Sequence, residues 1–172
     1  MNKLVGYSKI FPLILALGLL LLASCKSYEP VFVLSLHEFE EPQMATKLSR
    51  TVRDPTRQFS HTIRRLSFLD ARNFLFGEIY GPNEQGRYGV RIQVDRWYLG
   101  AMHQTAGSNL GLIYAVVVDG MYVGYSHFNK SMRDTDILEI DPLWSLRDAQ
   151  LLLDSLPKNY QHFNNWHRSF FE

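Results

Sequence analysis

An apolar run at residues 112–119, followed directly by a glycine, constrains the fold more than any other stretch of the chain. The run is too short to cross a membrane and is rich in β-branched side chains, which predicts a strand buried on both faces at the centre of a sheet. Asp119 and Gly120 then supply the positive φ angles that a two-residue turn needs, and residues 121–125 look extended again. The sequence therefore predicts a central β-hairpin.

Further strands are predicted on the N-terminal side of this hairpin. Residues 31–37 are apolar enough for a largely buried strand, and residues 46–52 and 59–66 alternate on either side of turn residues. Residues 74–80 and 88–94 form another predicted hairpin, in which buried positions alternate with Arg and Gln. The predicted sheet is therefore mostly antiparallel.

Two helices are predicted, and both have recognisable ends. Asp95 is placed to cap a helix over residues 95–107, and Ser145 opens a second helix that Pro157 ends. Asp70 is expected to cap a single helical turn. Beyond Pro157, residues 158–172 form an aromatic C-terminal tail, which either docks on the domain or serves as a recognition segment.

The N-terminus is typical of an exported chain. Residues 1–24 combine a basic start, an apolar core and small residues, which is the layout of a secretory signal. The segment Leu-Ala-Ser-Cys ending at Cys25 resembles the bacterial lipoprotein box, which implies cleavage before Cys25 and lipid on its sulfur. Cys25 is the single cysteine of the chain, so it forms no internal disulfide. The alternatives are a plain signal peptide and a short uncleaved anchor.

Cleavage and lipidation would determine where the protein works. Loss of residues 1–24 changes the formal charge from +1 to −1, which gives no reason to expect nucleic-acid binding. Residues 25–30 would be a lipidated tether and residues 31–157 a single α+β domain. The expected location is the cell envelope, anchored to the membrane through Cys25 and facing the periplasm. Lys26 favours the outer membrane by analogy with known sorting rules.

Residues 68–156 resemble the head of the first periplasmic domain of SecD and SecDF, accessory proteins of bacterial protein export. The resemblance rests on an ordered set: Asp70, the extended pairs, the helix at 95–107, the run Tyr-Ala-Val-Val-Val-Asp-Gly, and the Ser-Leu-Arg-Asp-Ala helix start at Ser145. It implies an α+β, ferredoxin-like fold, with a largely antiparallel sheet and helices packed on one face. It also implies contact with exported polypeptide. The proton-driven step of the full transporters is not expected, because no intramembrane carboxylate is predicted to remain.

No spacing in the sequence demands a catalytic, metal or cofactor site. His37 lies near three glutamates, but such a cluster at a strand end is typical of solvated surface. Ser126 and His127 are neighbours on a predicted strand, so their side chains point to opposite faces and do not act together.

The predicted function is therefore recognition without chemistry. We expect a lipid-anchored envelope protein with a non-catalytic polypeptide- or protein-binding domain, linked to export or envelope assembly. An envelope hydrolase, or another small-substrate enzyme whose site is hidden in the sequence, is the alternative, and a purely structural lipoprotein is a third. Aromatic residues make up 13% of the chain, and most are expected in the core. The candidate partner contacts among them are Tyr122, Tyr125, Phe128, Phe163 and Trp166.

Overall fold

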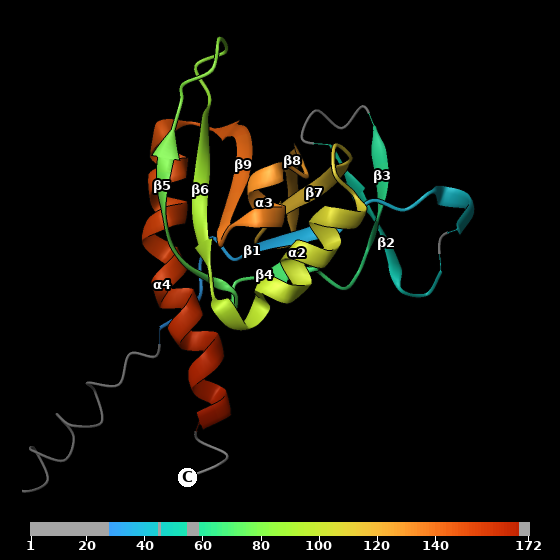
Figure 1. Cartoon of the computed structure of the whole chain (residues 1–172). Helices are drawn as coiled ribbons and strands as arrows, with labels where there is room; N and C mark the ends of the chain where they lie inside the picture. Colours follow the sequence, from blue (N-terminus) through green and yellow to red (C-terminus); the bar gives the residue numbers. More distant parts are fainter. Residues whose placement is uncertain (1–27, 45, 55–58, 169–172) are drawn as a thin grey trace, which may run out of the picture.

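The computed structural model describes residues 28–44, 46–54 and 59–168, and shows an α+β domain with three antiparallel sheets (Figure 1). The four-stranded sheet has the order β4-β1-β7-β8, with β1 Leu34–Glu38, β4 Leu69–Asp70, β7 Ile113–Val118 and β8 Met121–His127. The other two sheets are the hairpin of β2 Ser49–Arg53 with β3 Ser60–Arg64, and the sheet of β5 Phe74–Tyr80, β6 Tyr88–Val94 and β9 Ile137–Trp144. The helices are η1 Pro42–Met44, η2 Arg96–Tyr98, α2 Leu99–Ser108, α3 Lys130–Asp134 and α4 Leu146–Arg168.

The predicted central hairpin is confirmed. Strand β7 lies between β1 and β8, and the register pairs Val118 with Met121 across a two-residue turn. Asp119 and Gly120 have φ angles of 50° and 78°, the left-handed region that this turn requires. Both faces of β7 are buried, except at its first residue, Ile113, which is 41% exposed.

The main core fills the space between the four-stranded sheet, the three-stranded sheet and the helices. Tyr114 and Val116 point into it from β7, and Met102 and Met132 point into it from α2 and α3. Helix α4 packs along β5, on the left in Figure 1, while α2 packs against α3. The alternation predicted for β6 is present, since its apolar positions are buried in this core and Arg91 is exposed.

A second, smaller core lies on the opposite face of β7. The β2–β3 hairpin, at the right of Figure 1, contributes Val52 and Ile63, which pack against Ala115, Val117 and Tyr122. Phe39 closes one side of this cluster. The hairpin is therefore what makes β7 a strand that is buried on both faces.

The predicted α+β class with antiparallel strands is confirmed, but the strands form three sheets and not the single sheet expected, and their pairing does not confirm a ferredoxin-like topology. Strands β8 and β9 lie close together but form no ladder. Side chains bond to two of the backbone amides that a ladder between these strands would use. The carboxylate of Asp141 accepts from the His127 amide at 3.1 Å, and the hydroxyl of Ser126 accepts from the Asp141 amide at 2.9 Å. Because these bonds replace main-chain pairing, the two larger sheets remain separate.

The prediction that Pro157 ends the last helix was also wrong, because α4 continues to Arg168. Hydrogen bonds to distant residues hold the helix beyond the proline. Asn159 donates to the carbonyl of Val31 at 2.9 Å, and the hydroxyl of Tyr160 donates to Asp95 at 2.5 Å. The segment after Pro157 is therefore a docked part of the helix, not a separate tail, up to the last residue described.

Two caps differ in detail from the prediction. Asp70 ends β4 and accepts from the Arg72 amide in a turn, so it opens no helical turn. Asp95 does act as an N-cap, but of the short 3-10 helix η2, which leads into α2. Among the described residues, no helix combines the length and the apolar character that a membrane crossing requires.

Candidate functional site

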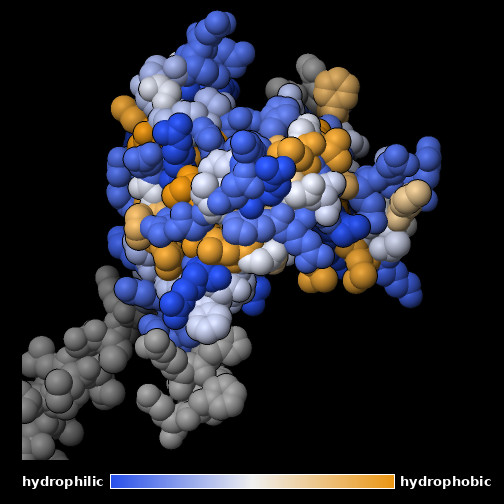
Figure 2. All heavy atoms as spheres, viewed as in Figure 1, coloured by the Kyte–Doolittle hydropathy of each residue, from blue (hydrophilic) through white to orange (hydrophobic). Residues whose placement is uncertain are grey.

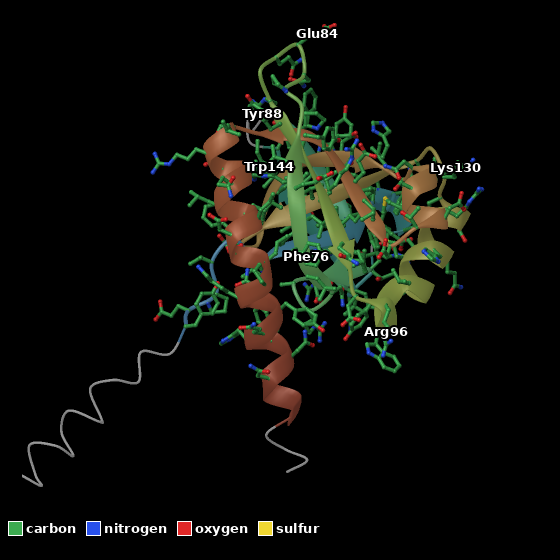
Figure 3. The ribbon with its side chains drawn as sticks, turned by 60° about the vertical axis from the view of Figure 1, so that its left-hand side comes forward. Phe76, Glu84, Tyr88, Arg96, Lys130 and Trp144 are labelled. Carbon is green, nitrogen blue, oxygen red and sulfur yellow. The ribbon has the colours of Figure 1, made fainter. Side chains whose placement is uncertain are left out.

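An open cleft of about 920 Å³ lies where the three sheets come together. Its walls come from β2, the β5–β6 loop, the start of β8 and the end of β9. Figure 3 shows that loop, marked by Glu84, projecting beyond the sheets at the end where Tyr88 and Trp144 lie, and in Figure 2 it is the hydrophilic projection at the top of the view. The cleft is therefore bordered by strand edges and by a protruding loop.

The outer edge of β2 faces this cleft with unpaired backbone groups. The hairpin is hydrogen-bonded at both ends, from the Arg65 amide to the Leu48 carbonyl at 2.7 Å and from the Asp54 amide to the Phe59 carbonyl at 3.0 Å. Paired positions alternate in an antiparallel ladder, so Thr51 and Arg53 direct their N–H and C=O groups away from β3. Within the described ranges, no residue bonds to those groups. The edge can accept another strand.

The side chains around the cleft are mixed in charge and partly apolar. Arg53 and Arg87 are cationic, Asp148 is anionic, and Met121, which is 71% exposed, and Leu143 offer apolar surface. Such a lining suits a polypeptide better than a small apolar ligand, because it offers charged as well as apolar contacts.

Tyr122 forms part of the cleft wall but is almost buried, at 7% exposed. Burial, and to a smaller extent the nearby Asp54, raises the pKa of the Tyr122 phenol to about 12. The hydroxyl therefore keeps its proton at neutral pH and is a neutral hydrogen-bond donor.

The other candidate contacts are scattered over the structure. Tyr125 is half-exposed on β8 and its ring lies edge-on to His127, with 5.8 Å between centroids. Phe128 is 2% exposed in the main core, so it is not available to a partner, which corrects that assignment. Phe163 is half-buried on α4, away from the cleft, beside a second groove. Cys25 and the side chain of Trp166 lie outside the described parts of the structure.

Asp119 does more than form the turn. Its carboxylate accepts from the backbone amides of Val33 at 2.8 Å and Phe32 at 3.1 Å. It therefore ties the segment before β1 to the tip of the central hairpin, a contact 86 and 87 residues apart in sequence that no local pattern could have revealed.

The sequence neighbours Ser126 and His127 do not line the cleft. Ser126 is buried, whereas His127 is exposed and pairs through Nδ1 with Asp141 at 2.7 Å, so the two point to opposite faces as predicted. In the part of the chain that the structure covers, no three His, Cys, Asp or Glu residues gather as metal ligands.

Sequence reasoning did not find the β2 edge. The hairpin itself was predicted, but which of its two edges stays open depends on tertiary contacts. Phe39 and Glu40 cover the β3 edge through a bridge to Ile63 and a 2.9 Å bond from the Glu40 amide to the Thr62 carbonyl. Nothing comparable covers β2 in the described segments.

No protein-family model matches this sequence, and no curated protein matches it either. The fold does match solved structures of SecDF. One of these, of a membrane component described as enhancing protein export, has a TM-score of 0.52 and 14% sequence identity over 90% of this chain and 71% of that one. Another, SecDF in a super-membrane-facing form, has a TM-score of 0.51 and 14% identity over 73% of this chain and 18% of that one. At this identity the likeness concerns the fold alone: the chain has a structural resemblance to the periplasmic region of SecDF.

Proposed function

We propose that this is a lipid-anchored envelope protein whose domain binds an extended polypeptide along the edge of β2, in protein export or envelope assembly. The observation that carries the proposal is the open backbone edge of Thr51 and Arg53 inside the cleft. The likeness of the fold to SecDF, a component that enhances protein export, supports the same class of partner.

Binding by strand addition suits a partner of variable sequence. The N–H and C=O groups of Thr51 and Arg53 would pair with the partner's main chain, which every polypeptide has. Met121 and Leu143 would contact alternate side chains of the added strand, while the arginines favour segments that carry acidic residues. The affinity then comes from backbone hydrogen bonds, and a mild preference for certain partner sequences comes from the side chains that line the cleft.

The substitution Thr51→Pro tests the edge directly. Proline removes the outward N–H of Thr51 but no ladder bond to β3, because that N–H does not take part in the hairpin. Thr51→Val is the matched control, since it keeps the N–H and the shape. The probe is a fluorescent peptide about ten residues long that alternates valine with serine, read by anisotropy. Thr51→Pro should lose most binding and Thr51→Val should keep it, at similar melting temperatures. Equal binding by both variants would refute the strand-addition proposal.

The lipid anchor has its own test. Radiolabelled palmitate should enter the wild-type protein, and Cys25→Ser should abolish the labelling and leave the full-length precursor. Labelling that persists in the serine variant would overturn the anchor while leaving the peptide experiment unaffected.

A further inference from the structure

A second groove, of about 650 Å³, lies on the face of β1 that points away from the main core. Its floor includes Ser35 and His37, and the end of α4 contributes His162 and Phe163. It shares Arg50 and Gly120 with the cleft, so the two hollows adjoin each other. The groove has no role in the strand addition proposed above.

The groove has an excess of guanidinium groups. Arg50, Arg65 and Arg72 line it together with a single carboxylate, that of Asp70. Asp70 is engaged by Arg72 through two bonds, of 2.6 and 3.0 Å. Arg50 and Arg65 have no carboxylate partner among the described residues. The groove therefore carries two positive charges that no carboxylate of the described residues pairs with.

The donors of Arg50 are also incompletely used. Its Nε is buried and has no hydrogen-bond partner within the described segments, and its Nη2 lies 3.5 Å from Nε2 of His37. A buried guanidinium nitrogen without a partner is unfavourable, and an anion in the groove would offset this cost through its attraction to the positive charge spread over the guanidinium.

His37 supplies orientation and no charge. It is 3% exposed, and burial, followed by the nearby charge of Arg50, lowers its pKa below the usual value. Its Nδ1 lies 2.8 Å from the carbonyl oxygen of Arg64, which can only accept, so Nδ1 carries the proton. Nε2 therefore accepts, at 3.0 Å from the hydroxyl of Ser35. The positive charge of the groove at neutral pH belongs to the arginines.

The groove lies close to the start of the described chain. The rings of Tyr28 and His162 are 5.9 Å apart, and the Tyr28 hydroxyl donates to Asn159 at 2.8 Å. Cys25 precedes Tyr28 by three residues, which span at most about 11 Å when fully extended. A lipid on Cys25 would therefore hold the rim of the groove near the headgroups of the membrane.

We propose that this groove binds the phosphate of an anionic membrane-lipid headgroup, which rests on the lipid anchor proposed above. Planar guanidinium groups bind phosphate oxygens in pairs, and Arg50 and Arg65 offer two of them without a competing acid. Phe163 gives the rim an apolar side chain. The headgroup phosphate would fix the orientation of the domain on the membrane, with the β2 cleft beside it.

The test uses the full chain in detergent micelles and short-chain, soluble lipids, with binding read by phosphorus NMR line broadening and by calorimetry. Dihexanoyl phosphatidylglycerol should bind, and dihexanoyl phosphatidylcholine should bind at least fivefold more weakly. Arg50→Gln and Arg65→Gln should each weaken phosphatidylglycerol binding at least fivefold, and Arg50→Lys should weaken it less. Arg133→Gln is the charge-matched control, because Arg133 is an exposed arginine paired with Asp134 outside the groove. It should leave binding unchanged.

Several results would overturn the proposal. Equal affinity for inorganic phosphate alone would make this a free-phosphate site, and tighter binding of a short acidic peptide would make it part of the polypeptide surface. Equal binding of both lipids, no binding of either, or equal loss in Arg133→Gln would also refute it. Because soluble lipids need no anchor, Cys25→Ser should bind phosphatidylglycerol as the wild type does. A result that refutes lipid binding in the groove can therefore be distinguished from one that refutes the lipid anchor or the strand addition.

Discussion

The two faces of β7 can be separated by the same substitution at neighbouring positions, Val116→Ala and Val117→Ala. Both side chains are fully buried, Val116 in the main core and Val117 in the small core beneath the β2–β3 hairpin. Each change deletes two carbon groups worth about 0.8 kcal/mol each in transfer free energy, and it leaves a small cavity. Each variant should therefore lose about 2 kcal/mol of unfolding free energy.

Urea unfolding of the two variants, followed by circular dichroism and tryptophan fluorescence, measures both losses against the wild type. Val116→Ala is the internal control, because Val116 faces the main core and is buried whether or not the hairpin covers the other face of β7. If Val117→Ala stayed within about 0.5 kcal/mol of the wild type while Val116→Ala did not, the hairpin would not cover β7 and the second core would be refuted. Equal losses in the two variants support two-sided burial.

Three further predictions test single contacts. Asp119→Ala should lower the unfolding free energy by about 1–3 kcal/mol, because two backbone amides lose their acceptor and alanine disfavours the φ of 50°. Asp119→Gly should lower it less. Equal melting temperatures of the wild type and the two variants would contradict this. Pro157→Ala should raise the melting temperature, since alanine restores a helical N–H inside α4, and a fall in the melting temperature would contradict this. Burial alone would raise the pKa of Asp70, but hydrogen bonds from Arg72 outweigh it and hold the pKa below its usual value. The stability that Asp70 adds is then present above its unfolded pKa and is lost as pH falls through the folded pKa. The loss of unfolding free energy caused by Asp70→Asn, measured by chemical unfolding, should therefore shrink in acid. A loss that is independent of pH would contradict the pairing of Asp70 with Arg72.

Local patterns predicted most of the strands but not their grouping into sheets. The β-branched run of β7 and the turn at Asp119 are decided within a few residues, so they could be read directly. The division between β8 and β9 depends on the side chains of Ser126 and Asp141, which replace ladder bonds only when the chain is folded. Propensity could not predict that α4 passes Pro157, because the bond from Tyr160 to Asp95 that holds it is a tertiary contact.

The candidate site was less predictable than the fold, for the same reason. A strand edge becomes a site only when other elements leave it open, and a cationic groove arises only when arginines from separate segments of the chain meet. Arg50, Arg65 and Arg72 are spread over 23 positions of sequence without a motif. The prediction of Tyr122 came close to the cleft because it follows the central turn, whereas Phe128, on the same segment, faces the core.

The pairing of β1 with β7 sets the order in which this protein can assemble during synthesis. The hairpins β2–β3, β5–β6 and β7–β8 join neighbouring segments and can close as soon as each is made. Strand β1 leaves the ribosome about 80 residues before its partner β7, so the four-stranded sheet must wait for most of the chain. During that interval Leu34 and Leu36, which are fully buried in the finished domain, lack the strand that pairs with β1 along its whole length. The N-terminal strand therefore stays exposed to aggregation until β7 has been made.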